Sequence, residues 1–241
     1  MNTTLNYSPN FDKKKRRPEE IKFIIFHYTG MKKEENSIDR LTSNKSKVSS
    51  HYFIKKSGEI LTLVPDLYIA WHAGKSSWKH FKSLNKYSLG IEISNPGHSN
   101  KYEHFNKKQI KSILKLSKYL IKKYKINQRF ILGHSDVAPE RKKDPGEKFP
   151  WRFLSKSKIG YWHNLNYSLH SKERKQKINT IHKDVFFKNL NKIGYAKKYT
   201  SEKKYSIFLV KAFQRRFRPE LVNGIIDKEC FIISKNLLRK F

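Results

Sequence analysis

Residues 23–26 read Phe-Ile-Ile-Phe, and a histidine, His27, follows them directly. Four consecutive aromatic or β-branched residues predict a short strand that is buried rather than half exposed. The run therefore requires a sheet with a covered core, and it places an imidazole at the end of a core strand.

Further strands and one clear helix are predicted along the chain. Residues 48–54 alternate between polar and apolar, a Ser-Gly pair at 57–58 predicts a turn, and residues 60–64 are mostly apolar, so we expect a hairpin. Residues 88–94 and 129–132 predict two more strands. Residues 107–125 carry apolar residues at helical spacing opposite a lysine-rich face. Strands mixed with helices predict an α/β (or α+β) fold, in which a mixed central sheet is flanked by helices.

Two more residues suited to metal binding lie beside turn-forming residues. His134 follows the predicted strand at 129–132, and Asp144 precedes a Pro-Gly pair ten residues later. The proline restrains the residue before it, which suits a fixed ligand. One histidine is weak evidence, since the chain has ten and histidines at strand ends usually form hydrogen bonds. Two imidazoles and a carboxylate are nevertheless a suitable set for catalytic zinc, which keeps a fourth position open for water.

The order of motifs supports this hypothesis. Residues 20 to 155 resemble the zinc N-acetylmuramoyl-L-alanine amidases, which are related to phage-type lysozyme amidases and to peptidoglycan recognition proteins. The motifs that carry the resemblance are His-Tyr-Thr-Gly at 27–30, Ser-Ser-His-Tyr-Phe-Ile at 49–54, Ala-Trp-His-Ala-Gly at 70–74, Gly-Ile-Glu-Ile-Ser-Asn at 90–95, the runs around His134 and Asp144, and Phe-Pro-Trp at 149–151. The resemblance is greatest to the AmiD and AmpD branch, where the third ligand is aspartate rather than cysteine.

The resemblance implies that His27, His134 and Asp144 hold one zinc ion per chain. Asp136, two residues after His134, is a competing carboxylate. An Asp-Pro turn at the surface is the alternative interpretation of Asp144.

Glu92 and Lys142 are the candidate catalytic residues. Glu92 lies on the otherwise apolar strand at 88–94, and apolar surroundings raise the pKa of a carboxyl group towards the range useful for proton transfer. A solvent-facing residue is the alternative. Lys142 lies two residues before Asp144 and in an extended chain would point the same way, so its ammonium group could stabilise an oxyanion. The resemblance implies a glutamate and a lysine in these roles.

Trp71, His72 and Asn95 are the candidate substrate-binding residues, and we expect Trp71 and His72 to line the substrate groove. His51 could instead pack beneath the sheet, and Tyr28 could only support His27. These assignments rest on the motifs at 27–30, 49–54, 70–74 and 90–95.

The chain is strongly basic, with 53 Lys and Arg, 20 Asp and Glu, and a net charge of +33. Such a charge attracts anionic partners: peptide-stem carboxylates, an acidic wall polymer or nucleic acid. The lysines are spread along the whole chain, so we favour a compositional bias. No base-stacking or recognition motif indicates a specific nucleic-acid partner. The one dense basic cluster, at 13–17, belongs to residues 1–20, which we expect to form a flexible basic tail.

No segment is typical of a signal peptide or long enough in apolar residues to span a membrane, which predicts a cytoplasmic protein. A periplasmic or cell-envelope location is the alternative, since related outer-membrane amidases carry a lipoprotein signal. The single cysteine, Cys230, excludes an intramolecular disulfide and is expected in the core. We expect a monomer.

The composition changes after the predicted catalytic domain at 21–155. Residues 156–180 are polar and predict a linker, and three helical patterns follow within 181–241. Residues 212–227 resemble part of the small three-helix peptidoglycan-binding domain that follows the catalytic domain in AmiD-type amidases. The alternative is a helical cap packed on the catalytic domain, because aromatic stripes at helical spacing usually form core.

The combined expectation is zinc-dependent hydrolysis of the amide between N-acetylmuramic, or anhydro-muramic, acid and L-alanine in peptidoglycan or muropeptides. The alternative is a non-catalytic peptidoglycan-binding protein on the same fold. Such a protein is expected to have lost a metal ligand, and this sequence has all three.

Overall fold

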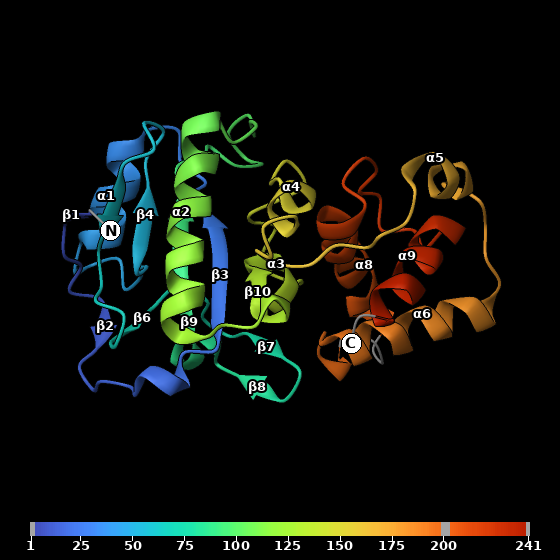
Figure 1. Cartoon of the computed structure of the whole chain (residues 1–241), viewed down its shortest axis with the longest axis horizontal. Helices are drawn as coiled ribbons and strands as arrows, with labels where there is room; N and C mark the ends of the chain where they lie inside the picture. Colours follow the sequence, from blue (N-terminus) through green and yellow to red (C-terminus); the bar gives the residue numbers. More distant parts are fainter. Residues whose placement is uncertain (1–2, 199–202, 240–241) are drawn as a thin grey trace.

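The computed structural model describes residues 3–198 and 203–239 (Figure 1). Its centre is a six-stranded mixed sheet with the strand order β1-β5-β4-β9-β3-β10. β4 and β5 form the antiparallel hairpin expected around residues 57–58, and the other neighbours are parallel. The strands of this sheet are β1 (Thr4–Leu5), β3 (Phe23–Tyr28), β4 (Tyr52–Ile54), β5 (Ile60–Thr62), β9 (Ser88–Ile93) and β10 (Ile131–Gly133). The predicted mixed sheet with flanking helices is confirmed.

The pleat of β3 determines where His27 points. Side chains alternate between the two faces of a strand. Ile24 and Phe26 pack in the core that also contains helix α2, whereas Phe23 and Ile25 pack in a second core on the opposite face. His27 continues the series of Phe23 and Ile25, so its ring lies on the face away from α2.

Helix α2 (Lys107–Tyr124) covers one face of the sheet, at the position that the sequence predicted (Figure 1). It begins with a capping box, in which the Asn106 side chain accepts from the Gln109 amide and the Gln109 side chain accepts from the Asn106 amide. Its fully buried residues Ile113, Leu116 and Leu120 pack with the apolar residues of β9. Burial of each stabilises the fold by about 1.5–3 kcal/mol relative to exposure.

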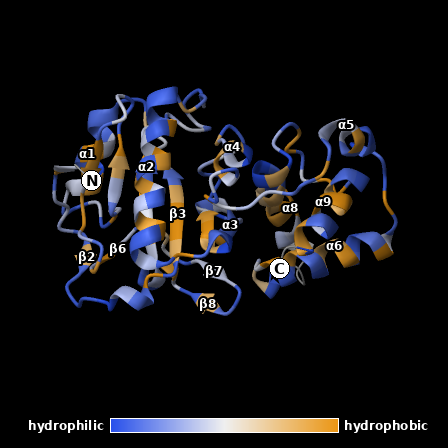
Figure 2. Cartoon of the chain, viewed as in Figure 1, coloured by the Kyte–Doolittle hydropathy of each residue, from blue (hydrophilic) through white to orange (hydrophobic). Residues whose placement is uncertain are grey.

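Three longer helices follow the sheet domain: α6 (Thr180–Ile193), α8 (Lys203–Phe217) and α9 (Lys228–Leu238). They match the three helical patterns in the sequence. α6 ends at Gly194, and the Asp227 side chain caps α9 by accepting from the amide of Cys230, which is buried. In Figure 1 these helices lie beside the β10 edge of the sheet, and Figure 2 shows that they carry hydrophobic and hydrophilic residues, whereas β3 and β10 are mostly hydrophobic.

The segment expected to be a linker, residues 156–180, contains helix α5 (Tyr167–His170) and a 3-10 turn at Ser171–Glu173. It is bound to α9, because Nδ1 of His170 and Nε of Arg174 lie 2.8 and 2.7 Å from the two carboxylate oxygens of the buried Glu229. The segment is therefore packed rather than a free linker.

The prediction of a flexible basic tail at residues 1–20 is wrong for the residues that the structure describes. β1 pairs with the edge strand β5. Arg16 is buried, and its guanidinium donates to the backbone oxygens of Asp66, Asn85 and Ser88 at 2.8–3.0 Å. A guanidinium has five N–H donors, so main-chain carbonyls can satisfy it inside a protein. The charge of the basic run therefore predicted a solvent-exposed Arg16, whereas its side chain is buried.

The remaining elements are small. They are helices α1 (Glu34–Thr42), α3 (His134–Val137) and α4 (Trp151–Ser155), 3-10 turns at Pro18–Glu20, Leu84–Tyr87 and Gln128–Phe130, and two-stranded pairs β2 (Phe11–Asp12) with β6 (Ile69–Ala70) and β7 (Ser77–Trp78) with β8 (Phe81–Lys82). Among the helices of the described ranges, none has both the length and the apolar character needed to cross a bilayer.

Candidate metal centre and active site

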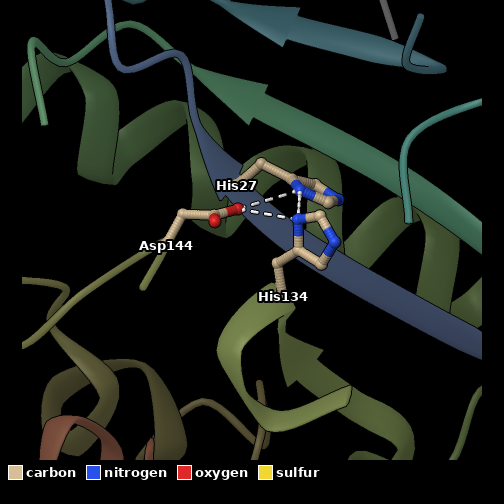
Figure 3. Close-up of side chains that lie close together, drawn as sticks. All are labelled: His27, His134 and Asp144. Carbon is tan, nitrogen blue, oxygen red and sulfur yellow. Dashed lines mark hydrogen bonds and ion pairs between the residues drawn. The ribbon is translucent and has the colours of Figure 1, made fainter. Parts of the chain in front are cut away.

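His27, His134 and Asp144 meet at one point, as the sequence predicted (Figure 3). The Nδ1 atoms of the two histidines lie 2.9 Å apart, and each lies 3.0 Å from Oδ2 of Asp144. All three side chains are buried. The three atoms form a nearly equilateral triangle, and one zinc ion can lie within bonding distance, about 2.0–2.2 Å, of every corner.

The sheet brings the ligands together from distant parts of the sequence. β10 pairs in parallel with β3, so His134, directly after β10, lies beside His27 at the end of β3. The loop of Asp144 is joined to this turn, because the amide of Ser135 donates to the Asp144 carbonyl at 2.8 Å. A Cβ at Gly133 would lie 2.6 Å from Cδ of Pro145, so the absent side chain allows the two segments to approach.

The protonation of the ligands suits a cation. Nε2 of His134 lies 3.1 Å from the Ala73 carbonyl oxygen, which can only accept, so Nε2 donates and Nδ1 is the ring nitrogen that faces the other ligands. Burial and the neighbouring His134 lower the pKa of His27 to about 4, so this ring is neutral at neutral pH. Burial would raise the pKa of Asp144, but the two imidazoles hold it well below its usual range. A neutral His27 and an ionised Asp144 are in their zinc-binding forms, and His134 presents Nδ1 to the same point.

Glu92 lies next to this triangle because β9 and β3 pair with His27 opposite Glu92. Its side chain is half-buried, and its atom Oε2 is buried with no hydrogen-bond partner among the described residues. Burial and, secondarily, the charge of Asp144 raise the pKa of Glu92 to about 8, against the smaller opposing effect of Lys142. The raised pKa expected for an apolar strand is present, but a carboxylate neighbour contributes to it as well.

A cavity of about 450 Å³ opens over these groups. Its walls include the three ligands, Glu92 and Lys142, together with Trp71. Nε1 of Trp71 donates to Asp12 at 2.7 Å, so the N-terminal segment helps to hold the wall. The three candidate ligands, the candidate proton carrier Glu92 and the ammonium group of Lys142 therefore border one solvent-accessible cavity.

Two predicted substrate residues have other surroundings. His72 borders the cavity but is only 9% exposed, and its ring lies against His27. Asn95 is buried and is not among the residues that line the cavity. Its carbonyl accepts from the Gly30 amide, and its side chain accepts from the Gly97 amide and donates to the Glu103 carbonyl, so it holds the loops beside the cavity.

Two of the residues left open by the sequence, Asp136 and His51, have hydrogen-bond partners outside the ligand triangle. Asp136, the competing carboxylate, accepts from the Gly133 amide and the Tyr195 hydroxyl, each at 2.8 Å, and pairs with Arg216. The carboxylate of Asp136 is therefore bonded to groups outside the ligand triangle and does not compete with Asp144. His51 is fully buried, and its Nδ1 accepts from the Gly90 amide at 3.0 Å.

Sequence reasoning missed one side of the cavity. The Tyr28 hydroxyl lies 2.8 Å from Nδ1 of His98, and Nε2 of His98 lies 3.0 Å from Oε2 of Glu147. Arg141 also lines the cavity and donates to the Ala73 carbonyl at 3.1 Å. No local pattern marks His98, Glu147 or Arg141, since their partners are distant in the sequence.

Comparison with known proteins agrees with this geometry. A family model described as N-acetylmuramoyl-L-alanine amidase matches residues 16–147. The chain belongs to the N-acetylmuramoyl-L-alanine amidase family. N-acetylmuramoyl-L-alanine amidase AmiD of Escherichia coli is 34% identical over 236 residues, covering 92% of this chain and 83% of AmiD. 1,6-Anhydro-N-acetylmuramyl-L-alanine amidase AmpD of Haemophilus influenzae is 32% identical over 170 residues, covering 63% of this chain and 90% of AmpD.

Two solved structures extend the likeness to the C-terminal helices. E. coli AmiD, in complex with the substrate anhydro-N-acetylmuramic acid-L-Ala-D-gamma-Glu-L-Lys, has a TM-score of 0.82 at 32% identity and covers 92% of this chain and 90% of AmiD. AmpDh3 from Pseudomonas aeruginosa has a TM-score of 0.81 at 28% identity, and the match covers 99% of this chain and 98% of AmpDh3. The family resemblance and the fold class inferred from the sequence are confirmed.

Proposed function

We propose that the protein is a zinc-dependent amidase that hydrolyses the bond between the lactyl group of muramic or anhydro-muramic acid and the L-alanine of a peptide stem. The observation that carries the proposal is the buried triangle of His27, His134 and Asp144, whose facing atoms lie 2.9–3.0 Å apart. Two imidazole nitrogens and a carboxylate oxygen that converge at this spacing can all bind one cation placed between them.

His27, His134 and Asp144 would hold one zinc ion, and the cavity would give the substrate access to it. A bound zinc ion supplies Lewis acidity and lowers the pKa of water to about 7. The protein contributes a buried ligand set: two histidines at the ends of the adjacent parallel strands β3 and β10, and Asp144 on a loop joined to the turn after β10.

The proton transfers are assigned to Glu92. Hydrolysis takes one proton from the attacking water and delivers one to the departing alanine nitrogen. A carboxyl group with a pKa raised to about 8 can accept and release protons near neutral pH. Lys142 lines the same cavity, and its ammonium group would stabilise negative charge on the carbonyl oxygen in the tetrahedral intermediate.

The substrate class follows from the cavity and from the relatives. The cavity walls carry four basic side chains, those of Arg40, Arg141, Lys142 and Lys143. A peptide stem with free carboxylates complements this charge. AmiD and AmpDh3 have been solved with an anhydro-muramyl peptide bound. We therefore propose a soluble muropeptide as the substrate, with Trp71 on the groove wall, and a monomer as the active form.

A non-catalytic peptidoglycan-binding protein on the same fold is the other candidate. It would need neither a complete ligand set nor a carboxyl group with a raised pKa. Both are present, and they face the same cavity, which favours the enzyme.

The test separates metal binding from chemistry. The purified protein should contain about one zinc per chain, and Asp144→Ala should lose most of it, whereas Asp39→Ala on the exposed surface of α1 should not. Glu92→Gln should keep zinc but cleave an anhydro-muramyl tripeptide roughly 10²–10⁴-fold more slowly. Lys142→Ala should likewise keep zinc and lose turnover.

Full zinc in Asp144→Ala would exclude Asp144 as a ligand. Turnover by Glu92→Gln at the wild-type rate would remove Glu92 as the proton carrier. A wild-type protein that binds zinc and muropeptide without cleaving it would favour the non-catalytic alternative.

A further inference from the structure

We propose that His72 is a positioning residue that, together with Ser88 and Gly90, fixes the orientation and the proton of the ligand His27. This role differs from the substrate contact that the sequence indicated for His72. The inference rests on the proposed zinc site, because its purpose is to present one ring nitrogen of His27 to the metal.

A chain of hydrogen bonds runs away from the ligand triangle. Nε2 of His27 lies 3.0 Å from Nδ1 of His72, and Nε2 of His72 lies 3.1 Å from Oγ of Ser88. Oγ of Ser88 lies 2.6 Å from the carbonyl oxygen of Leu84. The chain thus joins a metal ligand to a backbone carbonyl through two side chains.

The end of this chain determines its direction. A carbonyl oxygen can only accept, so the Ser88 hydroxyl donates to Leu84 and its oxygen accepts from Nε2–H of His72. Nδ1 of His72 is then unprotonated and accepts from Nε2–H of His27. Nδ1 of His27 is left with a free lone pair, and this is the atom that faces His134 and Asp144.

The backbone of β9 is adapted to this arrangement. Ser88, Gly90 and Glu92 alternate along one face of the strand. A Cβ at Gly90 would lie only 2.4 Å from Cγ of His72, so the missing side chain makes room for the ring. The same face therefore supplies the acceptor for His72, the space for it, and the candidate proton carrier.

Ala73, the residue after His72, bonds the other histidine ligand, His134. The Ala73 carbonyl accepts from Nε2 of His134 at 3.1 Å and from the guanidinium of Arg141 at 3.1 Å. Consecutive residues of one loop thus orient both imidazole ligands. Partners of this kind fix the tautomer and raise the basicity of a ligand, and their loss typically costs about 10–100-fold in metal affinity or activity.

The placement of His72 argues against a substrate contact. The residue is only 9% exposed, and both ring nitrogens are already hydrogen-bonded within the protein. A substrate would have to displace His27 or Ser88 to bond it. Loss of His72 should therefore weaken zinc binding and lower kcat, with little direct effect on KM.

The experiment compares His72→Leu, His72→Asn and Ser88→Ala in the full chain. Zinc affinity is measured by competition with a chelator, and the protonation of His27 is read from the ¹⁵N shifts of its ring in the zinc-free protein. We expect His72→Leu to bind zinc about 10–100-fold more weakly. His72→Asn should recover most of that loss, because its side-chain oxygen can stand where Nδ1 accepted. Ser88→Ala, the smallest change, should cause a smaller loss.

His170→Leu is the matched control, since His170 is buried to a similar degree but pairs with Glu229 and has no bond to a ligand or to β9. It should reduce stability and leave zinc affinity unchanged. Wild-type zinc affinity in His72→Leu, or an unchanged His27 tautomer, would overturn the inference. The tautomer readout needs no metal, so it decides the role of His72 even if the wild-type protein binds no zinc, in which case the proposed function fails separately.

Discussion

Glu92 shows how the surroundings of a single residue create chemistry. Its strand is apolar, its buried carboxylate oxygen Oε2 has no partner within the described part of the chain, and Asp144 adds a like charge. These factors favour the protonated form and raise the pKa to about 8, while Lys142 and Arg40 oppose them. The carboxyl group is therefore poised to gain or lose a proton near neutral pH, at a cost in stability when it is ionised.

That cost predicts a pH-dependent stability in the zinc-free protein. Because the folded pKa of about 8 lies above the ordinary value of 4.5, protonation of Glu92 favours the native state. This contribution is fully present below pH 4.5 and is lost as the pH rises through 8. Glu92→Gln, which is always neutral, should therefore be more stable than wild type at pH 9, by at least about 1 kcal/mol or 2–4 °C in Tm.

The measurement is thermal unfolding in a chelator between pH 5 and pH 9. The stability gain should shrink steadily towards pH 5. Glu35→Gln, an exposed change on α1, should give a difference that does not follow this course. A Glu92→Gln gain that is the same at every pH would show that its carboxyl group titrates normally.

At the scale of elements, β9 carries the polar face of the site. Its odd and even residues differ in role: Leu89, Ile91 and Ile93 pack in the core with α2, whereas Ser88, Gly90 and Glu92 face the ligands. The parallel pairing with β3 then aligns Glu92 with His27. A shift of one residue in this register would bury the polar set against α2, so the core also determines the geometry of the site.

Gly90→Ala tests this use of the strand. The added methyl group should displace the His72 ring and lower zinc affinity by an amount comparable to His72→Leu, about 10–100-fold. In a His72→Ala background the methyl group meets no ring, so Gly90→Ala should add little to the loss. Zinc titration of the single and double variants measures this coupling, and additive losses would mean that Gly90 does not act through His72.

At the scale of the whole molecule, the C-terminal helices share a core with the sheet. Phe23, Ile25 and Leu132 belong to one buried cluster with the apolar residues of α6, α8 and α9. The Arg216 guanidinium of α8 pairs with Asp136, donates to the Ile131 carbonyl at 2.9 Å, and lies 4.1 Å from the ring centre of Trp151. These contacts favour the helical-cap interpretation, and the division into separate domains stays a prediction.

The buried pair predicts a large effect far from the cavity. Arg216→Met leaves the carboxylate of Asp136 buried without its cation, which should destabilise the protein by about 3–5 kcal/mol. The double variant with Asp136→Asn should be more stable than Arg216→Met alone. Urea unfolding measures both, and the shared core predicts one transition. Two separate transitions, or a loss below about 1 kcal/mol in Arg216→Met, would contradict this coupling.

The sequence by itself determined the elements whose signals are local. The apolar run at 23–26, the hairpin around 57–58, helix α2 and the three C-terminal helices follow from periodicity, caps and turns, and the structure contains each of them. The ligand set needed the family motifs as well, because His27 and Asp144 are 117 positions apart and no spacing rule connects them.

Only the tertiary structure decided which polar groups those elements bury together. Arg16 reads as part of a solvated basic run, yet main-chain carbonyls enclose it. Asp136 pairs with Arg216, which is 80 positions away in the sequence, and His72 contacts His27, which is 45 positions away. The physical reason is that a polar side chain can be satisfied equally well by water or by a buried partner, and only the packing of distant segments determines which one it meets.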